Sequence, residues 1–243
     1  FTYAHNEITK YDESPKYAFQ SKVGQSANIP SIMISDGLFK DPDDVKNSNQ
    51  QIGGNLSAGD IKYVNISKLY GYDDDIVDIS DWVWAKNPTV PEIVYGFGPS
   101  IRWKNLDFSF FFQGVAKVSL VMSDFHPFGD NSLRNVLTGI ADDRWSPDNQ
   151  NINATYPRLT RDTSVNNTQR SDYWLRNAAF IKLKNAEIGY TYKNMRFYVS
   201  GMNLATFSPF KHWDPEQGGG NGLKYPTQRV FNFGFQMTIN NNR

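Results

Sequence analysis

The chain has 243 residues, 25 basic and 25 acidic side chains, no cysteine and 15% aromatic residues. Zero net charge gives no case for nucleic acid as a partner, and the lack of cysteine excludes disulfides and thiol chemistry. No window of about 18 uncharged apolar residues occurs, so no transmembrane helix is predicted. The chain begins Phe1-Thr2-Tyr3 without an initiator Met or a signal peptide, which predicts that it is the middle of a longer protein.

The first ninety residues predict only weak strands, at 1–9, 30–35 and 60–66. Long segments rich in Asp, Asn, Gly and Pro separate them, at 36–58 and 70–91, and similar segments recur at 124–172 and 205–227. Loops of this length are unusual in compact domains and usually functional.

The first strong strands form a predicted hairpin from Val94 to Gln113. Bulky apolar residues alternate with small or polar ones on either side of Lys104-Asn105, a polar pair of two-residue turn length. Such a turn sets Trp103 opposite Leu106, so the apolar sets of both strands fall on one face. A short helix is predicted next, after the cap-like Ser132 and through Leu133, Val136, Leu137 and Ile140.

A second hairpin is predicted around Lys193-Asn194, with Ile188 and Tyr190 on the same face as Phe197 and Val199. The apolar residues change parity just upstream of this hairpin, and a bulge near Lys184-Asn185 accounts for the change. The last strand, 229–239, alternates throughout: Phe231, Phe233, Phe235, Met237 and Ile239 oppose Val230, Asn232, Gly234, Gln236 and Thr238.

These patterns predict an all-β, antiparallel fold, and the apolar face has two possible environments. In a soluble sheet it lies against a core, whereas in an outer-membrane barrel it lies against lipid. Strands of about ten residues, short turns at one end and long loops at the other favour the barrel. The residues predicted to face lipid are Tyr95, Phe97, Trp103, Phe108, Phe110, Phe112, Phe231, Phe233 and Phe235.

Several motifs, taken in their order and spacing, resemble the SusC/RagA family of TonB-dependent outer-membrane transporters from Bacteroidetes. They are Asp36-Gly37-Leu38-Phe39, Gly59-Asp60-Ile61-Lys62-Tyr63, Tyr95-Gly96-Phe97 to Phe112-Gln113-Gly114, Asp143-Arg144-Trp145-Ser146-Pro147, Tyr156-Pro157-Arg158-Leu159, Tyr173-Trp174-Leu175-Arg176, Ile181 to Tyr190, Tyr198 to Leu204, Trp213-Asp214-Pro215-Glu216 and Tyr225 to Arg229. The resemblance implies that residues 1–243 are the C-terminal part of a roughly 22-stranded barrel, contributing about eight transmembrane strands with long extracellular loops. The resemblance further implies that the plug domain and the N-terminal strands lie outside residues 1–243.

The resemblance also implies TonB-dependent import of oligosaccharides or peptides across the bacterial outer membrane. The implied partners are a SusD-like lipoprotein lid, the TonB complex, outer-membrane lipid, the glycan or peptide substrate and the remaining part of the same barrel. No cofactor is expected.

Many relatives carry a calcium-like loop after the Gly59–Tyr63 motif, but the chain lacks its glycine-spaced ligands. We therefore expect no metal site, and interpret Asp73, Asp74, Asp75, Asp78 and Asp81 as a solvated acidic loop.

The sequence shows no nucleophile elbow and no zinc-binding histidine pair, so we expect no enzyme activity. The residues predicted to face the lumen or contact substrate are Ser100, Arg102, Gln113, Arg196, Ser200, Gln236, Trp82 and Trp84. These two tryptophans, like Trp145, Trp174 and Trp213, could instead belong to an aromatic girdle or to loop packing. A soluble carbohydrate-binding β-sandwich remains the alternative from another class, because sandwich strands also alternate. A passive porin or adhesin barrel is a third possibility.

Overall fold

The computed structural model describes residues 1–72, 74–123, 136–160 and 164–239. The chain divides into two compact units. Unit 1 contains Phe1–His5, Val90–Leu120 and Asn177–Arg243, and unit 2 contains Asn6–Thr89 and Val121–Arg176. None of the helices in the described ranges is both long and apolar enough to traverse a bilayer.

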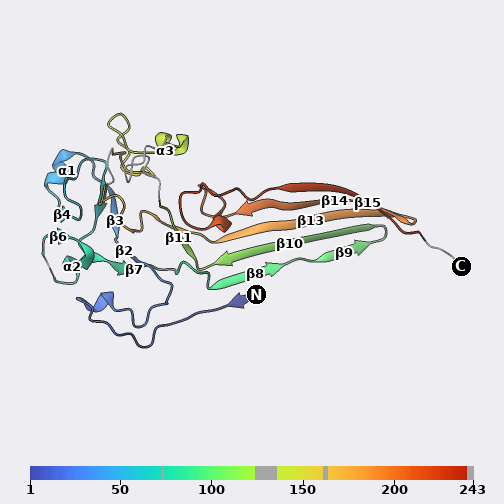
Figure 1. Ribbon diagram of the computed structural model, residues 1–243, viewed down its shortest axis with the longest axis horizontal. Helices are drawn as coiled ribbons and strands as arrows, with labels where there is room; N and C mark the ends of the chain where they lie inside the picture. The colour runs from blue at the N-terminus through green and yellow to red at the C-terminus, as the bar shows by residue number, and fades with distance from the viewer. Residues whose placement is uncertain (73, 124–135, 161–163, 240–243) are drawn as a thin grey trace. The chain divides into compact units, whose positions relative to one another are not determined.

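Unit 1 is dominated by one antiparallel sheet (Figure 1). Its strands are β1 (Thr2–Tyr3), β8 (Ile93–Phe97), β9 (Ser100–Trp103), β10 (Leu106–Ala116), β13 (Phe180–Tyr192), β14 (Met195–Phe207) and β15 (Val230–Met237). The order is β1-β8-β10-β13-β14-β15, with β9 also paired to β10. Because β13 runs along one side of β10, β8 and β9 share the other side. The seven strands therefore occupy six positions.

Both predicted hairpins form, and their turns are the predicted pairs. Trp103 pairs with Leu106 across the first turn, and Tyr192 pairs with Met195 across the second. The first residue of each turn, Lys104 and Lys193, has a φ of +53°, a left-handed conformation that two-residue hairpin turns require. The two short turns lie at the same end of the sheet.

The predicted bulge is also present. The register of β10 with β13 jumps from Phe111 opposite Asn185 to Phe112 opposite Leu183, so it skips Lys184. The β13–β14 register shifts at the same place. This shift is what keeps the apolar residues of β13 on one face on both sides of the bulge.

Unit 2 is built from short elements. They are η1 (Ala18–Gln20), β2 (Ser31–Ile32), β3 (Ser35–Leu38), α1 (Pro42–Lys46), β4 (Gln50–Gln51), β5 (Ile61–Tyr63), α2 (Ile66–Leu69), β6 (Ile76–Val77), η2 (Ile79–Asp81), β7 (Val83–Trp84) and α3 (Thr138–Asp142). Three two-stranded sheets pair β2 with β7, β3 with β5 and β4 with β6. Two further strands, β11 (Ser119–Val121) and β12 (Leu175–Asn177), pair with each other, and η4 (Pro215–Gln217) lies between β14 and β15.

Three of the family motifs interlock in the core of unit 2. Gly59 takes a φ of +84°, and a β-carbon there would come within 2.2 Å of the Trp145 ring, so only glycine fits under this indole. The next residue, Asp60, is buried and forms an ion pair with Arg158 at 2.7 Å. The peptide N–H of Arg158 donates to the Gly59 carbonyl at 2.9 Å. These motifs therefore have a structural role.

Buried side-chain amides complete this core by satisfying the backbone of β5. The Asn166 amide donates to the Ile61 carbonyl at 2.7 Å, and the Asn167 carbonyl accepts from the Ile61 N–H at 2.9 Å. The Gln51 amide also donates to the Ile61 carbonyl, at 3.1 Å. Paired backbone groups of this kind let a short strand lie in the interior without a full sheet around it.

The structure corrects several predicted elements. The strands predicted at 30–35 and 60–66 form in the small sheets of unit 2, so the large sheet has six strand positions where about eight were predicted. The strand at 1–9 is reduced to β1. The strand at 94–103 breaks into β8 and β9 at Gly98-Pro99, because proline has no N–H for the ladder.

Among the described residues, the predicted helix begins later than the sequence indicated. It spans Thr138–Asp142, and Leu137 precedes it in an extended conformation as the N-cap residue. Ser132 and Leu133 lie outside the described residues. The segments predicted as loops at 36–58 and 70–91 contain α1, β4, β6, η2 and β7. They fold because apolar residues scattered along them, such as Phe39 and Val77, are buried together in one core.

Candidate functional site

The two faces of the large sheet differ in chemistry, and the strand register keeps them apart. On one face, Phe108, Ile188, Val199 and Phe233 lie side by side across four strands. The neighbouring rows repeat this composition: Leu106, Tyr190, Phe197 and Phe235 form one row, and Phe110, Ala186, Gly201 and Phe231 form the other. We call this the apolar face.

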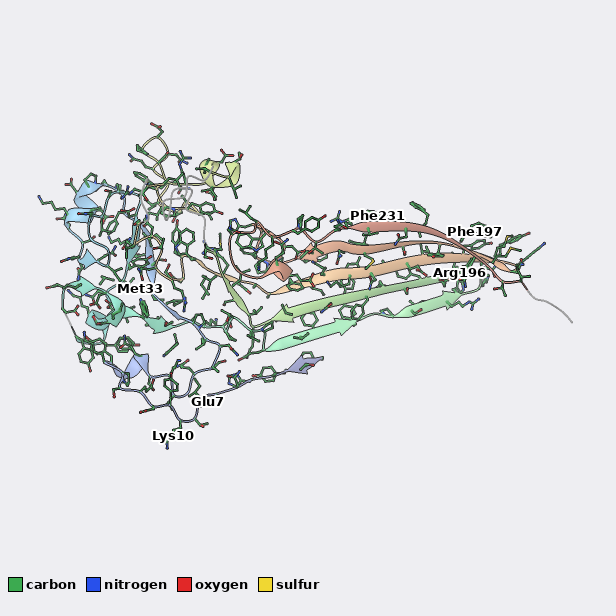
Figure 2. All side chains as sticks on the ribbon, in the orientation of Figure 1. Glu7, Lys10, Met33, Arg196, Phe197 and Phe231 are labelled. Carbon is green, nitrogen blue, oxygen red and sulfur yellow. The ribbon has the colours of Figure 1, made fainter. Side chains whose placement is uncertain are left out.

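The apolar face is open to its surroundings. Many of its bulky side chains are 40–84% exposed, among them Phe97, Trp103, Leu106, Phe108, Phe197, Phe231, Phe233 and Phe235. Figure 2 labels two of them, Phe197 and Phe231. Contiguous exposed aromatic surface of this extent marks a site of interaction with lipid or protein.

All six strand residues predicted to face a lumen lie on the opposite face, which we call the polar face. Ser100 pairs with Ser109, Arg102 with Asp107, and Gln113 with Lys182. Arg196 pairs with Gln236, and Ser200 pairs with Glu187 and Asn232. The structure therefore brings these six predicted residues onto one surface, although their contact with a substrate remains a prediction.

An ion cluster around Arg196 lies on the polar face, toward the end of the sheet that carries the two short turns (Figure 2). The Arg196 guanidinium reaches across β13 and donates to both oxygens of Asp107 on β10, with Nε at 3.0 Å. It also donates to Glu187 at 2.6 Å. A forked guanidinium between two carboxylates fixes three strands together while leaving one negative charge in excess.

Two glycines make room for this cluster. A β-carbon at Gly189 would come within 2.5 Å of the Arg196 guanidinium and 2.7 Å of the Asp107 carboxylate. The Tyr198 ring lies over Gly234, where a β-carbon would come within 2.0 Å, and the Arg196 guanidinium carbon lies 4.9 Å from the centre of that ring. An aromatic ring over a strand glycine covers the exposed backbone and restores packing.

A second ion cluster lies at the other end of the polar face. The Lys182 side chain, only 1% exposed, donates to Asp214 at 2.5 Å and to Glu216 at 2.7 Å. Lys184 donates to the other oxygen of Glu216 at 2.5 Å. Burial disfavours ionisation of Asp214 and Glu216, but the hydrogen bonds from the lysines outweigh it and lower the pKa of both carboxyls.

Trp82 and Trp84, the other predicted substrate residues, belong to unit 2 and are not part of this face. The Trp84 indole N–H donates to the carbonyls of Gln20 and Ser21, at 3.2 and 2.8 Å. Trp145 and Trp174 are buried in the core of unit 2. The loop-packing interpretation therefore holds for these last two tryptophans.

The prediction of a solvated acidic loop is wrong for Asp81, which is buried. Asp78 accepts from the Ser80 N–H, and Asp81 is buried and accepts from the N–H groups of Ser67 and Asp78. Both carboxylates thus cap the local backbone. Asp73 lies outside the described residues, and no cluster of three potential metal ligands occurs among those that are described.

Sequence reasoning missed the acidic partners Asp107 and Glu187, and also the Lys182 cluster. Asp107 and Glu187 carried a signal, because each is an acidic residue at a polar-face position of an alternating strand. Lys182 did not, because its partners follow it by 32 and 34 positions and lie in a segment without periodicity.

Comparison with known proteins agrees with the geometry of this sheet. The chain is 30% identical over 192 residues to TonB-dependent receptor P26 of Formosa agariphila, an alignment covering 68% of the chain and 19% of the relative. It is 24% identical over 173 residues to TonB-dependent receptor SusC of Bacteroides thetaiotaomicron, covering 66% of the chain and 16% of SusC. Two structures of the RagAB peptide importer superpose on 96% of the chain, with TM-scores of 0.64 and 0.65 and identities of 19% and 18%.

The chain is SusC/RagA-like. The resemblance predicted from the sequence motifs is confirmed, as is the antiparallel fold class. No family model matches the chain. This SusC/RagA-like chain spans a fifth or less of the length of the curated relatives and about a quarter of the RagAB chains. Its relatives are named as receptors and importers rather than enzymes, in agreement with the expectation that it has no catalytic site.

Proposed function

We propose that this chain forms part of the wall and outer loops of a TonB-dependent importer in the bacterial outer membrane. The observation that supports it best is the sheet with two faces of opposite chemistry, held in register over β10, β13, β14 and β15. The apolar face would contact lipid and the polar face would line the lumen, as in outer-membrane barrels generally.

The height of the apolar face supports this orientation. On β13 the apolar face runs from Ile181 to Tyr192. These twelve positions span roughly 35 Å along the strand at about 3.3 Å per residue. A strand tilt of about 40° reduces this to roughly 27 Å, close to the apolar band of about 25 Å in such barrels.

The proposed substrates are oligosaccharides or peptides, and the similarity to the RagAB peptide importer supports peptides in particular. Import would alternate between a lid-closed, substrate-loaded state and a state in which the plug is displaced by TonB. A SusD-like lipoprotein would serve as the lid. The six polar-face residues named above would belong to the wall past which substrate moves, while Trp82 and Trp84 would act only from the loops of unit 2.

The test uses the full-length gene in its own host. Cells with and without the gene are given fluorescent oligopeptides and fluorescent oligosaccharides, with and without a protonophore. We expect gene-dependent uptake of one of the two classes, and its loss when the proton gradient collapses.

Single substitutions of Ser100, Arg102, Gln113, Arg196, Ser200 and Gln236 should each change that uptake. Unchanged uptake in all of these variants would remove them from the substrate path. Recovery of the protein in the soluble fraction without detergent would refute the membrane importer and favour the soluble sandwich.

A further inference from the structure

The segment between β14 and β15, residues 208–229, is folded back onto the sheet rather than extended from it. We call it the β14–β15 loop. It contacts the sheet through the Lys182 cluster, in which Asp214 and Glu216 of the loop receive hydrogen bonds from Lys182 of β13. At its start, the Ser208 hydroxyl donates to the Ala179 carbonyl at 2.7 Å.

The strand register decides which face the loop covers. Lys182 pairs with Gln113 on one side and Thr206 on the other, and Gln113 shares its face with Asp107 and Ser109. The loop is therefore attached to the polar face. It lies at the end of the sheet opposite the two short turns.

The β14–β15 loop also has a small core of its own. Phe210 is buried and meets Trp213 edge-on at 4.6 Å. The Trp213 indole N–H donates to the Gly218 carbonyl at 2.9 Å, and its ring lies against Gly222, where a β-carbon would come within 2.6 Å. A loop packed by its own side chains keeps one shape when its ends are fixed.

We propose that the β14–β15 loop is a fixed constriction at the long-loop end of the import path, latched onto the lumen wall by the buried ammonium of Lys182. This inference rests on the proposed function, since the polar face is a lumen wall only in an importer. The latch is effective because Lys182 is desolvated: its two carboxylate partners are the groups that compensate its buried charge.

Lys184 provides a matched control on the same strand. It also contacts Glu216, but its side chain is 22% exposed where that of Lys182 is 1% exposed. Exposed ion pairs contribute little to stability, whereas removing one partner of a buried pair leaves an uncompensated charge. Lys182→Met should therefore release the loop and Lys184→Met should not.

The experiment measures access to the loop in intact cells. Gly219→Cys is introduced into the full-length protein. Residues 1–243 contain no cysteine, and any cysteine elsewhere in the full-length protein is replaced by serine. Position 219 is exposed. Two membrane-impermeant maleimides are compared, a small sulfonated dye and a maleimide carrying a polyethylene glycol chain of about 5 kDa, whose size keeps it out of a narrow lumen.

In the parent protein we expect the small reagent to label Cys at 219 and the large one to label it slowly. Lys182→Met should raise the rate of labelling by the large reagent about tenfold or more, and Lys184→Met should change it less than about threefold. The double variant Asp214→Asn/Glu216→Gln should behave like Lys182→Met. Since it alters only the loop, it keeps the test valid if Lys182→Met fails to fold.

Equal labelling by the large reagent in the parent and Lys182→Met proteins would overturn the latch, and so would equal effects of Lys182→Met and Lys184→Met. The length of the longest fluorescent oligomer that cells take up tests the constriction. Release of the loop should increase this maximum length, and an unchanged maximum length would overturn the constriction. The labelling does not depend on transport. If the parent protein shields Cys at 219 from the large reagent but imports nothing, the proposed function is refuted and the latch is not.

Discussion

Replacing Phe233 by arginine tests the proposed lipid contact of the apolar face. Phe233 is 84% exposed and sits mid-strand on β15, in the row that contains Val199, Ile188 and Phe108. If this row lies near the middle of a bilayer, an arginine there should destabilise the folded protein by about 2–4 kcal/mol. In water, the same change at an exposed position should cost less than about 0.5 kcal/mol.

The matched control is Asn232→Arg, one residue away on the opposite face and also exposed. It should be nearly neutral if the polar face meets water. The full-length protein is folded into lipid vesicles and titrated with urea, and heat-modifiable gel mobility reports the folded fraction. A difference of about 2–4 kcal/mol between the variants corresponds to a factor of roughly 30 to 1,000 in the folding equilibrium. Equal, small effects of both arginines would refute the lipid-facing assignment.

Two further predictions concern packing and pH. Gly59→Ala should destabilise unit 2 by about 2 kcal/mol or more beyond Gly71→Ala, because the two glycines have φ values of +84° and +85° but only Gly59 lies against the Trp145 ring. Limited proteolysis measures this, and equal sensitivity of the two variants would contradict it. The hydrogen bond between His5 and Glu92 outweighs the effect of burial and lowers the pKa of the Glu92 carboxyl. The ionised carboxylate therefore stabilises the folded state fully above the ordinary pKa of 4.5, and this stabilisation is lost as the pH falls through the lowered pKa. Hydrogen exchange in β1 and β8 should show this loss as the pH falls from 4.5, and Glu92→Gln should abolish it.

Local patterns were sufficient to predict the large sheet. Alternation over 106–113 and 229–239 assigns each side chain to a face, and a two-residue turn fixes the register of its two strands. The bulge at Lys184 could be predicted for the same reason, since a change of parity within one strand has few other physical explanations.

Local sequence patterns predicted little of the fold of unit 2. Its core joins Asp60 to Arg158 and Gly59 to Trp145, residues far apart in the chain whose segments show no periodicity. The family motifs marked these residues as notable without indicating their role. Their partners show that they stabilise the interior through an ion pair, a ring over glycine and side-chain amides on strand backbone.

The amino-acid sequence by itself therefore determined the strands of the large sheet, the chemistry of its two faces and its family resemblance, because period-two alternation and tight turns are properties of neighbouring residues. Only the tertiary structure decided that the supposed loops build a core, that Arg196 joins three strands and that Lys182 holds the β14–β15 loop. Those contacts join residues distant along the chain, and local sequence patterns carry no information about which distant groups share a buried charge.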